Sequence, residues 1–230
     1  MERYREKQGD LFRGIDTREL SDLLKQEVSK KIQNLEDNIL NIPENQYINN
    51  LIEEYKIECP IMQFDHYAVK PRRVLISSEI LPIYFKFAAP EEVERNVFRL
   101  CVPFVGDKEV LQYWPANIIS TLGGGSRFII GNKEVYVDVL DYPGNGENIK
   151  NECDRYIDDL KRMMGYLKNE IDSINRTMPQ YIRQTFIARK ERIKKEYDSI
   201  ANLGLPIVTN DTTPKTYIMY PLWKDAMGNQ

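Results

Sequence analysis

The spacing of apolar residues changes twice along the chain, from a helical period to a strand period and back. After a charged N-terminal arm, apolar side chains recur every three or four positions between Leu20 and Tyr55, as in amphipathic helices. Asp16 followed by Glu19 forms a capping-box sequence that predicts the start of a first helix, and Pro43 predicts the start of a second. The apolar positions are Leu20, Leu24, Val28, Ile32, Leu35 and Ile39 in the first helix and Tyr47, Leu51, Ile52 and Tyr55 in the second.

Between residues 61 and 142 the period becomes two, which is typical of strands. The segment 127–140 predicts two strands joined at Gly131 and Asn132, a two-residue link that favours a hairpin because positive φ costs little there. Strands and helices do not alternate, which argues against a parallel nucleotide-binding sheet. About five to seven mostly antiparallel strands are therefore expected. The other strand-like segments are 61–69, 72–77, 82–89 and 96–104.

The helical period returns at residue 149. Apolar residues then follow steps of three and four, which resembles the seam of a coiled coil. Pro179 predicts the start of a second helix with Gly204 just beyond its end, and so short a break predicts an antiparallel helical hairpin. Farther along, residues 215–220 predict one strand. The seam consists of Ile149, Cys153, Tyr156, Leu160, Met164, Leu167, Ile171 and Ile174.

Together these patterns predict an α+β protein. Its elements are a mostly antiparallel sheet, two N-terminal helices and a long C-terminal antiparallel helical hairpin. The expected segments are an N-terminal helical part (1–60), an antiparallel β core (61–142), the hairpin (143–206) and a tail (207–230). We expect them to form one compact domain.

Composition narrows the possible functions. The 32 basic and 35 acidic residues give a formal net charge of −3, so no overall field draws the protein to nucleic acid or to an anionic membrane. The N-terminus lacks the apolar core of a signal peptide, and no apolar run approaches the roughly 18 residues of a membrane span. Cys59, Cys101 and Cys153 are too widely spaced for CxxC ligand pairs, so reduced cysteines are expected. A cytoplasmic protein without membrane contact is therefore predicted.

Few residues suit catalysis. His66 is the only histidine, so a Ser-His-Asp or Cys-His site could be built only around it. Zinc and non-haem iron need several His or Cys ligands and are not expected. The acid-x-Lys triplets that end at Lys56 and Lys161 lie in helical patterns, whereas restriction-type nucleases place such triplets on strands. No catalytic residue, metal or cofactor is predicted, and an unrecognised enzymatic site near the end of strand 96–104 is kept as an alternative.

The stretch 102–125 holds the candidate ligand-binding or partner-binding residues. It leaves an apolar strand, passes a Gly-Asp turn and a Tyr-Trp pair, and enters three consecutive glycines. A phosphate loop is not favoured, because no Gly-Lys-Ser/Thr follows and the next segment is a strand pattern rather than a helix. We expect a structural corner in which Trp114 is buried among apolar neighbours, with a ligand loop as the alternative. The candidates are Asp107, Trp114, Gly123, Gly124 and Gly125.

A second candidate surface is basic and lies on the predicted helix after Pro179. Such a face could bind the phosphates of nucleic acid. The alternative is a solvated face, since the acids of helix 149–174 could neutralise it across the hairpin. Its residues are Arg183, Arg189, Lys190, Arg192, Lys194 and Lys195.

Several positions between 102 and 207 form a wider pattern. They are Pro103, Phe104, Gly106, Asp107, Trp114 and Pro115, followed by Arg189, Lys190, Ile193, Leu203, Gly204, Leu205 and Pro206. This pattern resembles the N-terminal region of bacterial restriction and anti-phage defence proteins, where a Pro-Phe-x-Gly-Asp segment precedes a helical hairpin ending Leu-Gly-x-Pro. The chain departs from that family at positions 116–117, which are Ala-Asn instead of Ser-Thr, and at 122–123, which are Leu-Gly instead of a proline pair.

In that family a separate nuclease or TIR effector domain accompanies this region. The resemblance therefore implies a non-catalytic sensor, adaptor or regulatory subunit of an anti-phage defence system, working with an effector protein on another chain. The alternative is a nucleic-acid-binding protein that uses the basic face 183–195. Apolar residues at the edge of the predicted hairpin also allow a homo-oligomer.

Overall fold

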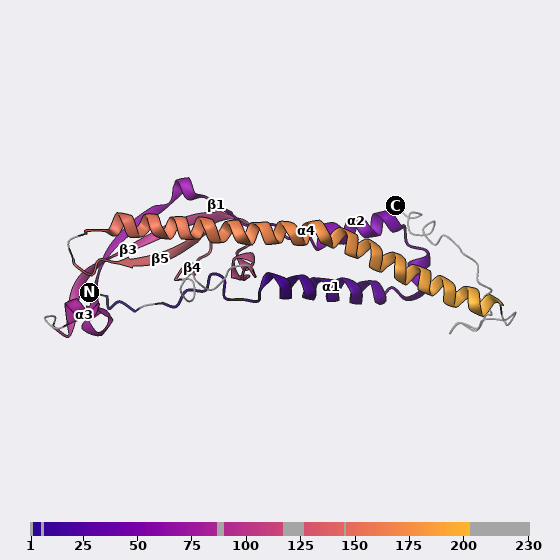
Figure 1. Cartoon of the computed structure of the whole chain (residues 1–230), viewed down its shortest axis with the longest axis horizontal. Coiled ribbons are helices and arrows are strands. Elements are labelled where there is room, and N and C mark those ends of the chain that lie inside the picture. The colour runs from indigo at the N-terminus through magenta and orange to yellow at the C-terminus, as the bar shows by residue number, and fades with distance from the viewer. Residues whose placement is uncertain (1, 6, 87–89, 117–126, 145, 203–230) are drawn as a thin grey trace, which may run out of the picture. The chain divides into compact units, whose positions relative to one another are not determined.

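The computed structural model describes residues 2–5, 7–86, 90–116, 127–144 and 146–202, and its elements are labelled in Figure 1. Contacts divide the chain into two compact units. One, the sheet unit, combines Met1–Leu20 with Glu58–Asp172. The other, the helical unit, combines Ser21–Ile57 with the chain from Ser173 onward.

The sheet unit contains all five strands of the described chain. They are β1 (Ile61–Met62), β2 (Ala68–Ser77), β3 (Glu92–Val105), β4 (Ile129–Ile130) and β5 (Glu134–Leu140). β3 lies at the centre, pairs with β1 and β2 along one edge and with β5 along the other, and β4 pairs with the outer edge of β5. Every pair is antiparallel, so the prediction of a mostly antiparallel sheet is confirmed.

The hairpin predicted between the last two strands is present, but Gly131 is required there for a reason other than positive φ. The amide of Gly131 donates to the carbonyl of Glu134 at 2.8 Å and closes the turn between β4 and β5. Gly131 does not adopt positive φ. Instead, a Cβ at this position would lie 2.9 Å from the Glu134 carbonyl oxygen, so the close approach of two backbones requires glycine.

One face of the sheet forms an apolar core. In β5 the side chains of Val135, Val137 and Val139 are buried and alternate with half-buried residues. The register places Leu100 of β3 opposite Val137, and a cross-strand apolar pair of this kind stabilises the sheet. Each such buried side chain contributes about 1.5–3 kcal/mol relative to an exposed one.

The helix α4 (Ile149–Asn202) begins in the sheet unit, where it runs along β3 and β5 (Figure 1). Phe128, just before β4, packs edge-on against Tyr156 of α4 with ring centroids 5.8 Å apart. Arg127 also donates to the hydroxyl of Tyr156 at 3.2 Å. In this part of α4 the buried apolar residues are Cys153, Ile157, Leu160, Met164, Leu167 and Ile171.

The helical unit packs three helices, namely most of α1 (Thr17–Gln33), α2 (Glu44–Glu54) and the second part of α4. The hydroxyls of Ser29 in α1 and Tyr181 in α4 are 2.7 Å apart. Tyr47 of α2 stacks on Phe186 of α4 with ring centroids 5.5 Å apart. The core of this unit consists of Val28, Ile32, Ile39, Ile48, Leu51, Ile174, Met178, Ile182, Phe186 and Ile193.

The predicted C-terminal helical hairpin is wrong, because α4 is one helix of 54 residues that passes through Pro179. Met178, which is 3% exposed, continues the buried stripe from Ile174 to Ile182 without a change of phase. Burial on both sides of the proline therefore outweighs the loss of one backbone hydrogen bond. The hydroxyl of Thr177 also donates to the carbonyls of the preceding turn.

Other predicted elements differ in detail. Segment 82–89 was expected as a strand, but Ile83–Lys86 forms the short helix α3, which follows a proline as helix starts often do. Segment 61–69 is interrupted by the 3-10 helix η2 (Phe64–His66). The first helix ends at Gln33, since Glu36 adopts φ of 46° and begins the 3-10 helix η1 (Glu36–Leu40).

The expected strand 215–220 lies outside the described residues, together with positions 203–206 of the wider sequence pattern. None of the helices in the described part of the chain combines the length and apolar character needed to cross a lipid bilayer. The predicted first helix does start as expected, because the Asp16 carboxylate accepts the Glu19 amide at 2.8 Å.

Candidate functional site

The stretch 102–116 is held as a corner within the sheet unit. Gly106 has φ of 118°, and a Cβ there would come within 3.1 Å of Pro60. Asp107 is exposed and caps the 3-10 helix η4 (Lys108–Gln112) by accepting the Glu109 amide at 2.9 Å. Asp107 therefore has a local structural role.

Trp114 is half-buried rather than buried as predicted, and its backbone is fully engaged. Its amide donates to the Ile15 carbonyl and its carbonyl accepts the Thr17 amide, both at 2.9 Å. Next to it, the Ala116 amide donates to a carboxylate oxygen of Glu170 at 2.8 Å, and the buried Thr17 hydroxyl also bonds to this carboxylate. These bonds tie the corner to the start of α1 and to Glu170 within α4, both distant from it in sequence.

Gly123, Gly124 and Gly125 lie outside the described residues. Their part in ligand binding, like that of Asp107 and Trp114, stays a prediction. The residues that the structure describes up to Ala116 have hydrogen-bonded backbone groups at Trp114 and Ala116, as expected for a structural corner.

The basic residues of α4 lie in the helical unit and are partly paired. Lys190 lies 3.6 Å from Glu44 of α2, and Arg192 lies 3.3 Å from Glu196 one turn later. Arg189 is half-buried and donates to the carbonyl of Gln33 at 3.5 Å. The predicted neutralisation across a hairpin is wrong, because α4 does not fold back on itself.

Three basic residues of this set, Arg183, Lys194 and Lys195, are exposed. Among the residues that the structure describes, no carboxylate lies within ion-pair distance of them. They form the part of the predicted basic face that is available to an anion.

The residues considered for nucleophilic chemistry are not assembled into a site. His66 is exposed in η2. Cys59, Cys101 and Cys153 are free thiols, and burial raises the pKa of each above its usual value. Thiols with a raised pKa stay protonated at neutral pH and react slowly. Within the described ranges, no group of three or more His, Cys, Asp or Glu is arranged to hold a metal ion.

A charged cluster lies on the sheet face opposite Val135, Val137 and Val139, next to the apolar cluster that Val74, Ile76 and Val97 form on this same face. Asp138 of β5 accepts two hydrogen bonds from Arg99 of β3, at 2.8 and 3.1 Å, and one from Arg72 of β2, at 2.6 Å. The guanidinium of Arg99 also stacks over the ring of Tyr136, 4.3 Å from its centroid. The three side chains thus join three neighbouring strands.

The electrostatics of this cluster favour its charged form. Burial raises the pKa of Asp138, but the hydrogen bonds and charge of Arg99, with the charge of Arg72, outweigh it and leave the pKa below its usual value. The hydrogen bond to Asp138 in turn raises the pKa of Arg99. Because Asp138 pairs with both guanidinium groups and Arg72 also lies 3.8 Å from Glu2, we interpret this cluster as a structural tie.

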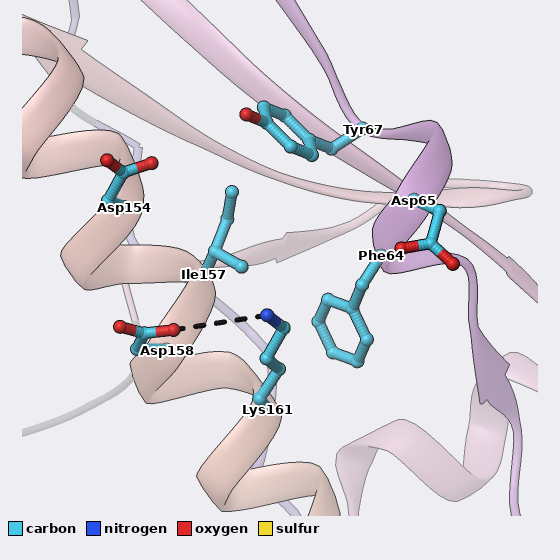
Figure 2. A pocket seen from close by; sticks show the side chains of 7 residues that line it. All are labelled: Phe64, Asp65, Tyr67, Asp154, Ile157, Asp158 and Lys161. Carbon is cyan, nitrogen blue, oxygen red and sulfur yellow. Dashed lines mark ion pairs between the residues drawn. The ribbon is translucent and has the colours of Figure 1, made fainter.

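An open groove lies between η2 and the first part of α4, both in the sheet unit (Figure 2). Its volume is about 550 Å³. From the sheet side it is lined by Phe64, Asp65 and Tyr67. From α4 it is lined by Asp154, Ile157, Asp158 and Lys161.

The groove combines aromatic rings with an excess of negative charge. Three aspartates face one lysine, which leaves two negative charges unbalanced. The ammonium of Lys161 lies 5.6 Å from the ring centroid of Phe64 and 4.0 Å from a carboxylate oxygen of Asp158. Tyr67 is 45% exposed, which is high for a large aromatic side chain.

The sequence did not single out the groove residues as a site. Phe64, Asp65 and Tyr67 fall in the strand-like segment 61–69, and Lys161 enters the sequence analysis only as the end of an acid-x-Lys triplet in a helical pattern. One local signal was present, because Asp154, Asp158 and Lys161 follow steps of four and three and so share one helix face. Nothing local indicated that this face meets residues 64–67.

No family model matches the chain, and no curated protein or solved structure matches it either. The resemblance of residues 102–207 to defence proteins therefore stays a prediction. The function proposed below therefore rests on the chain's own side chains, and the groove and the basic residues of α4 are two exposed charged sets among the described residues.

Proposed function

We propose that the chain is a non-catalytic sensor, adaptor or regulatory subunit of a bacterial anti-phage defence system, and that it works with an effector on another chain. The observation that carries this proposal is the open groove between η2 and α4. Exposed aromatic and charged side chains gathered in one hollow are typical of surfaces that bind another protein.

Two further features support a binding role. The only histidine is exposed in η2, and burial raises the pKa of all three thiols, which makes them poor nucleophiles. The resemblance of residues 102–207 to the N-terminal regions of defence proteins supplies the biological setting.

Phage plating tests the proposal. Cells would carry the gene for this chain, the neighbouring gene for a nuclease or TIR effector, or both. Protection is expected only from the pair, and the double variant Asp154→Asn with Asp158→Asn should abolish it. The control variant, Glu191→Gln with Asp198→Asn, removes the same charge from two exposed acids of α4 outside the groove and should protect fully. Protection by this chain alone would overturn the proposal, as would turnover of plasmid, RNA, ATP or NAD by the purified chain.

A second candidate function is nucleic-acid binding through α4. The observation that favours it is the exposure of Arg183, Lys194 and Lys195. If these residues bind phosphates, the affinity for DNA or RNA should fall steeply with salt, and each Lys→Gln change should lower the slope by about 1. A flat salt dependence would remove this candidate.

A further inference from the structure

We propose that the groove between η2 and α4 binds an arginine side chain on the surface of a partner protein. This inference rests on the proposed function, because it names the chemistry by which the partner is recognised. A guanidinium group prefers two things together, an aromatic face to stack on and a carboxylate to pair with. The groove offers both.

The carboxylates are placed to receive a cation. Asp154 and Asp158 lie one turn apart on α4, both are exposed, and both line the groove (Figure 2). Asp65 adds a third carboxylate from η2. With Lys161 as the only cation among the lining residues, the groove keeps two negative charges for a ligand to balance.

Lys161 shows that a cation fits this environment. Its ammonium reaches from α4 toward the Phe64 ring, 5.6 Å from the centroid, and pairs with Asp158 at 4.0 Å (Figure 2). The pair is long, and its side chains are 52% and 79% exposed, so it contributes little. An incoming arginine can therefore displace Lys161 at small cost.

The shape of the groove favours a protein over a small molecule. All of its charged side chains and Tyr67 are exposed, and only Ile157 among its lining residues is buried. Small molecules bind in enclosed pockets that cover most of their surface. An open groove suits a side chain that another surface carries into it.

Arginine fits better than lysine for a geometric reason. Its planar group can stack on Phe64 or Tyr67 while it donates two parallel hydrogen bonds to Asp154 or Asp158. An ammonium can face a ring and pair with a carboxylate, as Lys161 does, but it lacks the planar fork that donates two parallel hydrogen bonds while stacking.

The test is an NMR titration of the full chain with N-acetyl-arginine methylamide. The matched probe is the citrulline analogue, which has nearly the same shape without charge. Backbone signals of residues 64–67 and 154–161 should shift saturably with the arginine probe, with Kd on the order of 1 mM. The citrulline probe should cause no saturable shift.

Three variants and a control sharpen the test. Asp158→Asn should weaken binding of the arginine probe about fivefold, and Phe64→Leu about threefold. Lys161→Met should tighten it about threefold, because it removes the resident cation and keeps the apolar stem. The control Asp198→Asn makes the same side-chain change as Asp158→Asn at an exposed position of α4 outside the groove, and it should leave Kd within twofold.

The Lys161→Met variant separates the proposal from a purely structural role for Lys161 most clearly. The proposal predicts tighter binding of the arginine probe, whereas a structural role predicts equal or weaker binding. Unchanged affinity in this variant would overturn the proposal, as would saturable binding of the citrulline probe or tighter binding of N-acetyl-lysine methylamide. A Gly-Ser-Arg-Ser-Gly peptide should bind at least as tightly as the amide probe, and exclusion of the peptide would refute a protein occupant. These measurements use no effector, so they can fail while the plating test succeeds, and the reverse also holds.

Discussion

Replacing Asp138 with asparagine should destabilise the sheet unit far more than loss of a surface ion pair. The Asp138 side chain is 10% exposed and accepts three hydrogen bonds from Arg99 and Arg72. Asparagine keeps the shape and removes the charge, which leaves Arg99 without its carboxylate and Arg72 with only the exposed Glu2, 3.8 Å away. Removing one partner of a buried ion pair costs about 3–5 kcal/mol.

The expected cost here is smaller, because the two arginines are 25% and 30% exposed and water screens them. We expect about 1–3 kcal/mol, or a fall in Tm of roughly 3–10 °C for a protein of this size. Thermal unfolding followed by circular dichroism at pH 7 measures the effect. The matched control is Glu94→Gln on β3. Glu94 pairs with Arg73 at 3.3 Å on the surface, so this substitution should lower the unfolding free energy by less than about 0.5 kcal/mol.

The pH dependence provides an independent check. Because the folded-state pKa of Asp138 lies below its ordinary value of 3.8, the stabilisation is fully present above that value and is lost as the pH falls through the depressed pKa. The gap in Tm between wild type and Asp138→Asn should therefore close in strong acid. An equal Tm for both proteins at pH 7, or a gap that persists unchanged below the depressed pKa, would refute this interpretation of the cluster.

Two further predictions concern the loop before α4 and the proline within it. Asp141 is 1% exposed, and its carboxylate accepts hydrogen bonds from the amides of Gly144 and Gly146 at 3.0 and 2.9 Å. Asp141→Ala should lower the unfolding free energy by about 2–4 kcal/mol and expose both amides to hydrogen exchange. Unchanged protection of these amides would contradict this role of Asp141. Pro179→Ala should raise the unfolding free energy of the helical unit by about 2 kcal/mol in urea titrations, since it returns an amide hydrogen bond to the Asn175 carbonyl. A lower midpoint in that variant would show that the proline itself is required.

The sequence predicted those parts of the fold that depend on local pattern. The alternation in β5 and the apolar β3 identified the central strands, and the Asp16 cap marked the start of α1. The prediction failed at Pro179, where local propensity pointed to a break and tertiary burial of Met178 decided otherwise.

The candidate site could not be predicted, because its parts meet only in three dimensions. The groove joins η2 to a face of α4 that lies far along the chain, and the cluster around Asp138 depends on the register of three strands. Register follows from the whole sheet, and no single segment encodes it.

The central claim, that the groove receives the partner, is tested most directly by site-specific photo-crosslinking in phage-challenged cells. A photoreactive phenylalanine analogue would replace Tyr67 in the groove or, as a control, Tyr166 on α4, since the two side chains are 45% and 42% exposed. The account predicts an adduct with the effector from position 67 alone, with the crosslinked peptide mapping beside an arginine of that protein. Equal adducts from both positions, or none from position 67 while the chain still protects the cells, would contradict it.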